Sequence, residues 1–317
     1  MQRILVLGGT GFVGQRICAR LASRNLALIV PTRRRRNGRD LMLLPAIDVL
    51  EADIHDDHAL ARLVGRADAV INLVGVLHSP PGEPWGPAFD RAHVQLPTRV
   101  AAECARQDRR LIHVSALGVN PQSDQLPSAY LRSKAAGEAA IAASGLKAYT
   151  IFRPSVIFGP GDSFLNLFAT LQRWLPVMAL GRANAQFQPV YVGDVAEAVN
   201  NVLDNPATWG KTYELAGPEI YSLRELVRLA GEISGHVRPI IALPDGLGAL
   251  QARLLEKMPG PTLMSMDNFD SMAKPNIATG PMAEVLGMKG TTIGSVAPGY
   301  LRAQDARFAL ERAHARR

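Results

Sequence analysis

The stretch Arg3-Ile4-Leu5-Val6-Leu7-Gly8-Gly9-Thr10-Gly11-Phe12-Val13-Gly14 decides how the first part of the chain folds. Its opening apolar run, 3–7, predicts a strand that is buried on both faces. Glycines at positions 8, 11 and 14 follow at once, and residues 11–24 place Phe12, Ile17 and Leu21 on one side of a helix. A strand that leads through a glycine turn into a helix is the context of a phosphate-binding loop.

The three glycines have separate roles in such a loop. Gly8 permits the tight turn, Gly11 lets the backbone approach a pyrophosphate closely, and Gly14 lets the helix pack close to the strand. The amino end of the helix adds unpaired N–H groups and a partial positive charge. The sequence therefore predicts a dinucleotide site here, and the alternative is a glycine turn with a purely structural role.

The rest of the chain continues the alternation of strands and helices. We expect strands at 27–32, 48–51, 69–73, 110–115 and 148–152, a long crossover at 84–107 and a helix at 128–144 that Ser128 caps. After Arg153-Pro154 we expect helices at 164–175, 195–203, 223–234 and 247–258, with short strands at 212–215 and 237–242. This order predicts an α/β fold, a doubly wound parallel sheet of the Rossmann type with a smaller mixed, mostly helical C-terminal region.

We place the domain boundary near Pro160. Residues 1–160 are then the dinucleotide-binding Rossmann domain, and residues 161–317 form a substrate or partner region that interleaves with the sheet. Within that second part, Phe164, Phe168, Leu171 and Trp174 form a helical stripe that we expect to be buried, although a partner or lipid is the alternative contact. Asp194 is expected to cap the helix that follows it.

Composition and the two cysteines favour a cytoplasmic protein. The 317 residues are 47% hydrophobic, enough for a sizeable core. Cys18 and Cys104 lie in helix-like stretches and are expected to be small buried side chains in a reducing compartment. The first strand begins directly after Met1, and we find no apolar run long enough to span a bilayer. Peripheral contact with the inner face of the membrane stays open.

The net charge of +7 is concentrated in two places, 33–36 with Arg39 and the C-terminal arginines 312–317. We interpret the terminal arginines as a solvated tail and, because no aromatic-basic pattern accompanies them, expect no nucleic-acid partner. His55 and His58, beside Asp56 and Asp57, are interpreted as the start of a surface helix, so no metal site is expected.

The end of the second predicted strand indicates which dinucleotide is bound. NAD sites usually have a carboxylate there for the ribose 2′-hydroxyl. This chain has Thr32-Arg33-Arg34 instead, and guanidinium groups can pair with a 2′-phosphate. We therefore favour NADP(H), with NAD(H) the alternative if the arginines are merely solvated. Asp53 and Ile54, after the third strand, are expected to meet the adenine, unless Asp53 caps the next helix.

Tyr130 and Lys134 are four residues apart on a predicted helix and therefore share one face. A nearby ammonium lowers the pKa of a phenol from about 10 toward the range of a general acid or base. Such a pair can move the proton that accompanies hydride transfer at a carbonyl.

These motifs together resemble the extended and atypical short-chain dehydrogenase/reductases, the NAD-dependent epimerase/dehydratase type, over essentially the whole chain. The resemblance rests on six segments, in this order: Gly8-x-x-Gly11-x-x-Gly14, Asp53-Ile54, Asn72-Leu73-Val74-Gly75, His113-Val114-Ser115-Ala116, Tyr130-x-x-x-Lys134 and the run from Arg153-Pro154 to Gly159-Pro160. More narrowly, 113–118, 130–134 and Leu243-Pro244-Asp245-Gly246 are similar to bacterial relatives of the nucleotide-binding accessory subunit of respiratory complex I.

The resemblance assigns roles to individual residues. The pyrophosphate cradle would comprise Gly8, Thr10, Gly11, Phe12, Val13 and Gly14. Val74 and Gly75 would lie along the cofactor, Lys134 would also reach the nicotinamide ribose, and Pro154 and Ile157 would border the nicotinamide. The family adds a Ser or Thr that polarises the substrate carbonyl. Ser115 is the hydroxyl available here, whereas an alternative alignment puts Ala116 at that position and leaves the catalytic set incomplete.

The function favoured is NADP(H) binding in a protein similar to the complex I accessory subunit, with oxidoreductase activity through Tyr130, Lys134 and Ser115. One alternative is a sugar-nucleotide epimerase, dehydratase or reductase. Another is a non-catalytic assembly subunit in which NADPH is structural. The expected partners are accordingly a small-molecule substrate of unknown identity and a respiratory complex or the membrane surface.

Overall fold

The computed structural model describes residues 1–24, 26–123, 125–260 and 262–302, so the C-terminal arginines 312–317 lie outside the described residues. Contacts group the chain into two compact units. The first unit comprises Met1–Pro154, Val192–Leu215 and Thr279–Lys289; the second comprises Ser155–Tyr191, Ala216–Ala278 and the chain from Gly290 onward. Because both units are discontinuous in sequence, the single boundary near Pro160 stays a prediction.

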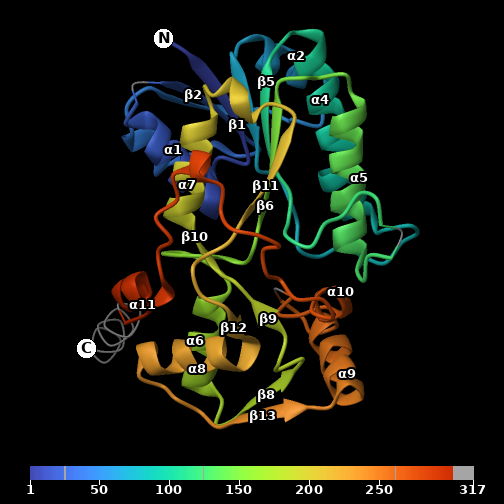
Figure 1. The fold of residues 1–317 in the computed structure, drawn as a ribbon, viewed down its shortest axis with the longest axis vertical. Coiled ribbons are helices and arrows are strands. Elements are labelled where there is room, and N and C mark those ends of the chain that lie inside the picture. The colour runs from blue at the N-terminus through green and yellow to red at the C-terminus, as the bar shows by residue number, and fades with distance from the viewer. Residues whose placement is uncertain (25, 124, 261, 303–317) are drawn as a thin grey trace. The chain divides into compact units, whose positions relative to one another are not determined.

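The first unit contains a parallel sheet of seven strands within the described residues (Figure 1). Its strands are β1 Arg3–Leu7, β2 Ala27–Thr32, β3 Ile47–Glu51, β4 Ala69–Asn72, β5 Arg110–Val114, β6 Tyr149–Pro154 and β11 Lys211–Leu215. Their order in the sheet is β11-β6-β5-β4-β1-β2-β3, and every neighbouring pair is parallel. The order reverses between β1 and β4, where such sheets bind ligands at the carboxyl ends of the strands.

Helices cover both faces of this sheet, as Figure 1 shows. They are α1 Phe12–Ala22, α2 Asp57–Gly65, α3 Pro87–Phe89, a π-helix Asp90–Gln95, α4 Leu96–Arg106, α5 Ala129–Ala143 and α7 Val192–Val202, with 3-10 turns at Arg35–Gly38, Leu41–Leu43, Pro206–Thr208 and Glu284–Leu286. Helix α1 packs against α7, while α4 contacts both α2 and α5. The fold is therefore the predicted doubly wound α/β fold.

The core of the sheet explains why its strands are apolar runs. Leu5, Leu7 and Val70 are fully buried, and they pack with side chains of α2 and α4 such as Val64 and Val100. Cys18 and Cys104 are also fully buried and free, which confirms that both are small core side chains. None of the helices in the described residues has the length and hydropathy needed to cross a bilayer.

The second unit is built from short strands and helices. Its strands are β7 Ile157–Phe158, β8 Met178–Gly181, β9 Gln186–Phe187, β10 Val190–Tyr191, β12 Tyr221–Ser222 and β13 Ile240–Leu243. Its helices are α6 Leu165–Trp174, α8 Leu223–Ser234, α9 Asp245–Glu256, α10 Met266–Ser271 and α11 Ile293–Val296. The strands pair as β7 with β10, β8 with β13, and β9 antiparallel to β12. Helices α6 and α8 pack together over a shared core.

Two expectations about side chains in this part of the chain are wrong. Phe164, Phe168 and Leu171 pack against the core of the second unit, but Trp174 is 75% exposed because the helix ends there and the ring projects beyond the packed face. Asp194 does not occupy the N-cap of α7, because the helix begins two residues earlier, at Val192. Asp194 is instead buried in the first turn of the helix, where the negative charge of its carboxylate interacts favourably with the positive end of the helix dipole.

Candidate cofactor and catalytic site

The glycine loop joins β1 to α1 in a turn that only glycines accommodate. Gly8 has a φ of +80°, and a Cβ there would lie 3.2 Å from the backbone of Leu73. A Cβ on Gly14 would lie 2.4 Å from the carbonyl oxygen of Gly8 and 2.6 Å from Cα of Gly9. The backbone N–H of Gly11 donates to that same Gly8 oxygen at 3.1 Å. The loop therefore holds the start of α1 directly against its own backbone.

The amino end of α1 carries no side-chain cap. Gly11 occupies the N-cap position and, because it has no side chain, supplies no capping hydrogen bond to the first turn. The free N–H groups of Phe12 and Val13 at such a helix start suit an anion, because they add to the positive end of the helix dipole. Thr10 adds rigidity to the loop, since its carbonyl oxygen accepts from Nε2 of Gln15 at 3.1 Å. This cradle fits the pyrophosphate of a dinucleotide.

The arginines after β2 lie beside this loop. Arg33 and Arg34 are exposed, and the hydroxyl of Thr32 donates to the carbonyl oxygen of Arg34 at 3.2 Å. In the turn that follows, a Cβ on Gly38 would lie 3.4 Å from the side chain of Thr10. The arginine-bearing turn is therefore anchored next to the phosphate loop.

Asp53 and Ile54 follow β3 and therefore lie at the same carboxyl edge of the parallel sheet as the glycine loop, which follows β1. Asp53 is exposed, and its carboxylate accepts from the backbone N–H of His55 at 2.9 Å. The cap of α2 is Asp56, whose carboxylate accepts from the N–H of Ala59 at 2.7 Å. The alternative interpretation of Asp53 as that cap is therefore wrong, because the helix begins three residues later than that interpretation requires. A contact between Asp53 or Ile54 and adenine stays a prediction.

Tyr130 and Lys134 both lie on α5, whose N-cap is Ser128 as predicted: its hydroxyl accepts from the N–H of Leu131. Lys134 is only 4% exposed, and its Nζ donates to the carbonyl oxygen of Val114 at 3.2 Å. A Cβ on Gly75 would lie 3.3 Å from that Nζ. Lys134 therefore reaches from α5 to the ends of both β5 and β4.

The burial of Lys134 changes its acid–base behaviour. Desolvation lowers the pKa of this ammonium from 10.5 to about 8, although Glu138 opposes the change. The ring of Tyr130 is half-buried, with its centroid 6.0 Å from that of Phe89 and 5.4 Å from that of His93, both in edge-on arrangements. The helix thus presents a lysine that changes charge near neutral pH and a tyrosine whose ring is fixed by two neighbours.

The remaining predicted site residues stand as follows. Ser115 is buried directly after β5, and its hydroxyl has no hydrogen-bond partner among the described residues. Pro154 ends β6 in the first unit, whereas Ile157 lies in β7 of the second unit. The roles of Ser115, Pro154 and Ile157 at a substrate or nicotinamide stay predictions, as does the contact of Val74 with the cofactor.

Two buried polar side chains at these strand ends belong to the motifs of the resemblance, but sequence reasoning gave them no role. Asn72 and His113 lie side by side in β4 and β5, with 3.2 Å between Nδ2 and Nδ1, and Oδ1 of Asn72 accepts from the N–H of Val74. Burial, with the charge of Lys134, lowers the pKa of His113 to about 3, so its ring is neutral. The available signal was a polar residue inside an otherwise apolar strand. Burying such a group costs free energy unless it is hydrogen-bonded, so its presence indicates a specific partner.

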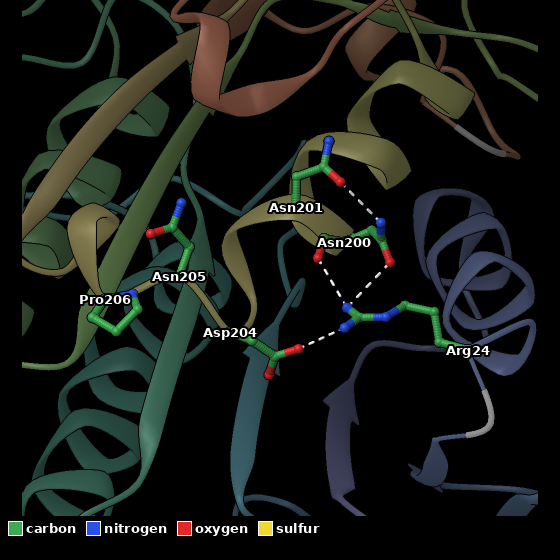
Figure 2. Close-up of a pocket in the computed structure, with 6 residues that line it drawn as sticks. All are labelled: Arg24, Asn200, Asn201, Asp204, Asn205 and Pro206. Carbon is green, nitrogen blue, oxygen red and sulfur yellow. Dashed lines mark hydrogen bonds and ion pairs between the residues drawn. The ribbon is translucent and has the colours of Figure 1, made fainter.

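A pocket of about 450 Å³ lies at the opposite end of α1 from the glycine loop (Figure 2). Its lining residues are Arg24, Asn200, Asn201, Asp204, Asn205 and Pro206. The guanidinium of Arg24 pairs with Asp204 at 2.6 Å and donates to the backbone oxygen of Asn200 at 3.1 Å. These bonds tie the end of α1 to α7. Because the guanidinium of Arg24 already has a carboxylate partner, it is not available to an anionic ligand in this pocket.

The parallel sheet, the glycine loop that leads from β1 into α1 and the flanking helices define a protein of the Rossmann type. The family model described as "NAD dependent epimerase/dehydratase family" matches residues 4–216, about two thirds of the 317-residue chain. The chain therefore belongs to the NAD-dependent epimerase/dehydratase family, and the resemblance predicted from its motifs is confirmed.

Curated relatives also agree with the narrower resemblance. The mitochondrial NADH dehydrogenase (ubiquinone) 1 alpha subcomplex subunit 9 of Arabidopsis thaliana is 30% identical over 285 residues, which cover 84% of this chain and 68% of that protein. The ceramide reductase of Caulobacter vibrioides is 30% identical over 247 residues, 76% of this chain and 74% of its own. Aligned regions span 59 to 68% of the length of the plant, Dictyostelium discoideum and Mus musculus subunits.

Solved structures agree on the fold. UDP-glucuronic acid 4-epimerase from Bacillus cereus, in complex with UDP-glucuronic acid and NAD, superposes with a TM-score of 0.70 at 17% identity, covering 95% of this chain and 97% of that chain. Pal from Bacillus thuringiensis gives a TM-score of 0.73 at 16% identity, covering 97% of this chain and 100% of that one. At these identities the similarity concerns the fold.

Proposed function

We propose that this protein binds NADP(H) at the glycine loop and uses it in an oxidoreductase reaction. The observation that carries the proposal is the cradle itself: Gly14 has no room for a Cβ, and α1 begins without a side-chain cap. A buried carbonyl or side chain would normally satisfy such a helix start. Its openness, together with membership of the family, supports a pyrophosphate as the group that Gly8, Thr10, Gly11, Phe12, Val13 and Gly14 hold.

The preference for NADP(H) rests on Arg33 and Arg34. Both side chains are exposed beside the loop, and the carboxylate of Glu51 accepts from the backbone N–H of the next residue, Arg35. Two guanidinium groups favour a 2′-phosphate, which carries charge that NAD lacks.

The experiment compares the wild type with the double variant Arg33→Ala/Arg34→Ala by titration with NADPH and NADH. We expect the variant to lose at least tenfold in NADPH affinity, because it loses charge-assisted bonds, and to keep its NADH affinity within about twofold. Arg62→Ala, an exposed arginine on α2, is the matched control and should change neither. Equal loss for both nucleotides would overturn the preference for the 2′-phosphate.

The bound nicotinamide supplies or accepts a hydride. The chain's own contribution is proposed to be proton transfer at the hydroxyl of Tyr130, whose pKa the ammonium of Lys134, on the same helix α5, would lower. The expected substrate is a small molecule with a carbonyl or secondary hydroxyl, and Ser115 is proposed to polarise that oxygen. We therefore expect Tyr130→Phe to bind NADPH normally but to lose turnover at least a hundredfold, as measured by NADPH absorbance with small carbonyl compounds as substrates.

A second function, association with a respiratory complex, is favoured by a different observation. Helix α9 exposes Leu247, Leu250 and Leu254 on one side, each more than half exposed. Such an apolar stripe commonly marks a protein interface, and the plant, Dictyostelium discoideum and Mus musculus relatives are subunits of mitochondrial NADH dehydrogenase. We propose that this stripe contacts a protein subunit of such a complex, at the inner face of the membrane.

Affinity purification of the tagged chain from its native cells tests this second function. The wild type and Tyr130→Phe should both recover respiratory subunits, whereas Leu250→Glu/Leu254→Glu should not, because charged side chains oppose apolar burial. Glu256→Gln, on the same helix, is the control and should behave as wild type. Equal recovery by the leucine variant and the wild type would contradict the interface.

A further inference from the structure

His93 is a buried histidine whose two ring nitrogens bind two different elements. It lies in the π-helix Asp90–Gln95 and is 1% exposed. Its Nε2 accepts from the backbone N–H of Val76, in the segment after β4, at 3.1 Å. Its Nδ1 lies 2.9 Å from the hydroxyl oxygen of Ser133 on α5. One side chain therefore connects the segment after β4 with the helix that carries Tyr130 and Lys134.

These hydrogen bonds fix the tautomer of His93. Because Nε2 accepts a hydrogen bond from the N–H of Val76, it carries no proton, and the neutral ring is protonated on Nδ1. The hydroxyl of Ser133 donates to the carbonyl oxygen of Tyr130 at 2.8 Å, so it is free to accept from Nδ1–H. Burial and the charge of Lys134 keep the pKa of His93 far below its usual value, in agreement with a neutral ring.

The surroundings of His93 make its position rigid. Phe89 stacks on one side, with ring centroids 5.3 Å apart, and Tyr130 meets the ring edge-on at 5.4 Å. A Cβ placed on Gly75 would lie 3.5 Å from Nε2 of His93 and 3.3 Å from Nζ of Lys134. The backbone of α5 closes the other side: a Cβ on Gly137 would lie 2.0 Å from the carbonyl oxygen of His93. The ring thus fills the space between the segment after β4 and the Tyr130–Lys134 face.

We propose that His93 is a positioning residue, which holds the segment of Val74 to Val76 at a fixed distance from Tyr130 and Lys134 through its Nδ1-protonated tautomer. The inference rests on the proposed function, in which Gly75 and Lys134 serve the nicotinamide half of the cofactor. It follows that His93 supports binding of that half and contributes nothing to the adenosine half, whose predicted contacts lie at Arg33, Arg34, Asp53 and Ile54.

Two probes separate the halves of the cofactor: NADPH, and adenosine 2′,5′-bisphosphate, which lacks the nicotinamide and its ribose. We expect His93→Leu to weaken NADPH at least tenfold and to leave the bisphosphate affinity within twofold, as measured by calorimetric titration. His93→Gln should recover most of the NADPH affinity, because its amide oxygen can accept from the N–H of Val76. His58→Leu, at an exposed histidine on α2, is the control and should change neither affinity.

The outcomes distinguish the inference from the proposed function. If the wild type binds neither probe, the proposed function fails and the inference falls with it. If the wild type binds both, and folded His93→Leu keeps its NADPH affinity or loses both affinities equally, the positioning role alone is overturned. Should His93→Leu fail to fold, His93→Gln and His93→Asn still decide, because only the Gln amide reaches the Nε2 position; equal NADPH affinities for these two would overturn the role.

Discussion

The free-energy cost of burying a charged group in the site is clearest at Lys134. Lys134 is 4% exposed, and its ammonium donates a hydrogen bond to the carbonyl oxygen of Val114. Water would stabilise the charged form better, so the pKa falls to about 8. A lysine whose pKa lies this close to physiological pH can respond to the charge of a neighbouring phenol or cofactor, which is the behaviour the proposed chemistry needs.

This burial predicts a characteristic pH dependence of stability. The folded-state pKa of Lys134, about 8, lies below its ordinary value of 10.5, so the unfolded chain binds more protons between those two values. The free energy of unfolding of the wild type should therefore rise with pH across that window, relative to Lys134→Met, by about 3 kcal/mol. Denaturant unfolding of both proteins at pH 7 and pH 10.5 measures the difference; parallel curves would contradict it.

A second residue-scale prediction concerns the buried ion pair of Glu138 with Arg153. Glu138 is 2% exposed, and the guanidinium of Arg153 bonds both carboxylate oxygens, the shortest contact being 2.6 Å. Replacing the carboxylate leaves a partly buried cation without its charge partner, so Glu138→Gln should lower the free energy of unfolding by about 3 kcal/mol. Glu232→Gln, which removes an exposed pair with Arg228, should cost less than about 0.5 kcal/mol. Equal costs in denaturant unfolding would refute the argument.

Single residues also mark what the sequence could and could not reveal about the site. Tyr130 and Lys134 were predictable because helical spacing alone puts them on one face. His93 was not, because its partners Val76 and Ser133 are distant in sequence and only the fold brings them to its two nitrogens. The same holds for Asn72 and His113, which adjoin through strand pairing.

At the scale of elements, the packing of α1 onto the glycine loop determines whether the cradle exists. Helix and loop approach so closely that even a methyl group at Gly14 would overlap the backbone of Gly8 and Gly9. No side chain is available to yield, because the overlapping atoms are main-chain atoms. The geometry of the cradle and the stability of the βα unit therefore depend on the same glycine.

Gly14→Ala is expected to separate α1 from the loop. We predict a loss of about 1–3 kcal/mol in the free energy of unfolding, typical of overpacking, together with at least a tenfold loss in NADPH affinity. Gly246→Ala on α9 is the matched control, because a Cβ there meets nothing within 4 Å. It should be neutral or slightly stabilising, since Ala favours a helix by up to about 1 kcal/mol over Gly. Wild-type stability and affinity in Gly14→Ala would show that the cradle tolerates a side chain.

Helices and strands could be predicted from the sequence where their apolar residues recur with a clear helical or strand period. Strands β1 and β2 and helix α8 begin and end where the apolar pattern places them, because each is buried along a whole face. Strands β7, β8, β9 and β12 were missed, since β7, β9 and β12 are two residues long and β8 has four, too few to show a clear period. The π-helix before α4 was also missed, as its extra residue in the turn has no sequence signature.

At the scale of the whole molecule, a ligand that binds only the folded chain must raise its stability. The linkage is about 2.7 kcal/mol when the ligand is present at a hundred times its Kd. We therefore predict that NADPH raises the midpoint of thermal unfolding by several degrees, increasing with nucleotide concentration, and that NADH does so less at equal concentration. Differential scanning fluorimetry measures both; an unchanged midpoint at millimolar NADPH would contradict binding to the native fold.

The fold of the first unit was predictable because its sheet is parallel and therefore buried on both faces, so that each strand is an apolar run. The division of the chain was harder to anticipate. Val192–Leu215 and Thr279–Lys289 return to the first unit after long excursions, and local patterns contain no information about such returns.

The central claim, that a dinucleotide diphosphate lies against the backbone at the start of α1, is tested most directly by a crystal structure of the protein grown with NADPH. We predict electron density for the diphosphate beside the N–H groups of Phe12 and Val13, with the 2′-phosphate facing Arg33 or Arg34. Density for the nucleotide at any other place, or an ordered glycine loop with no nucleotide at saturating concentration, would contradict the account.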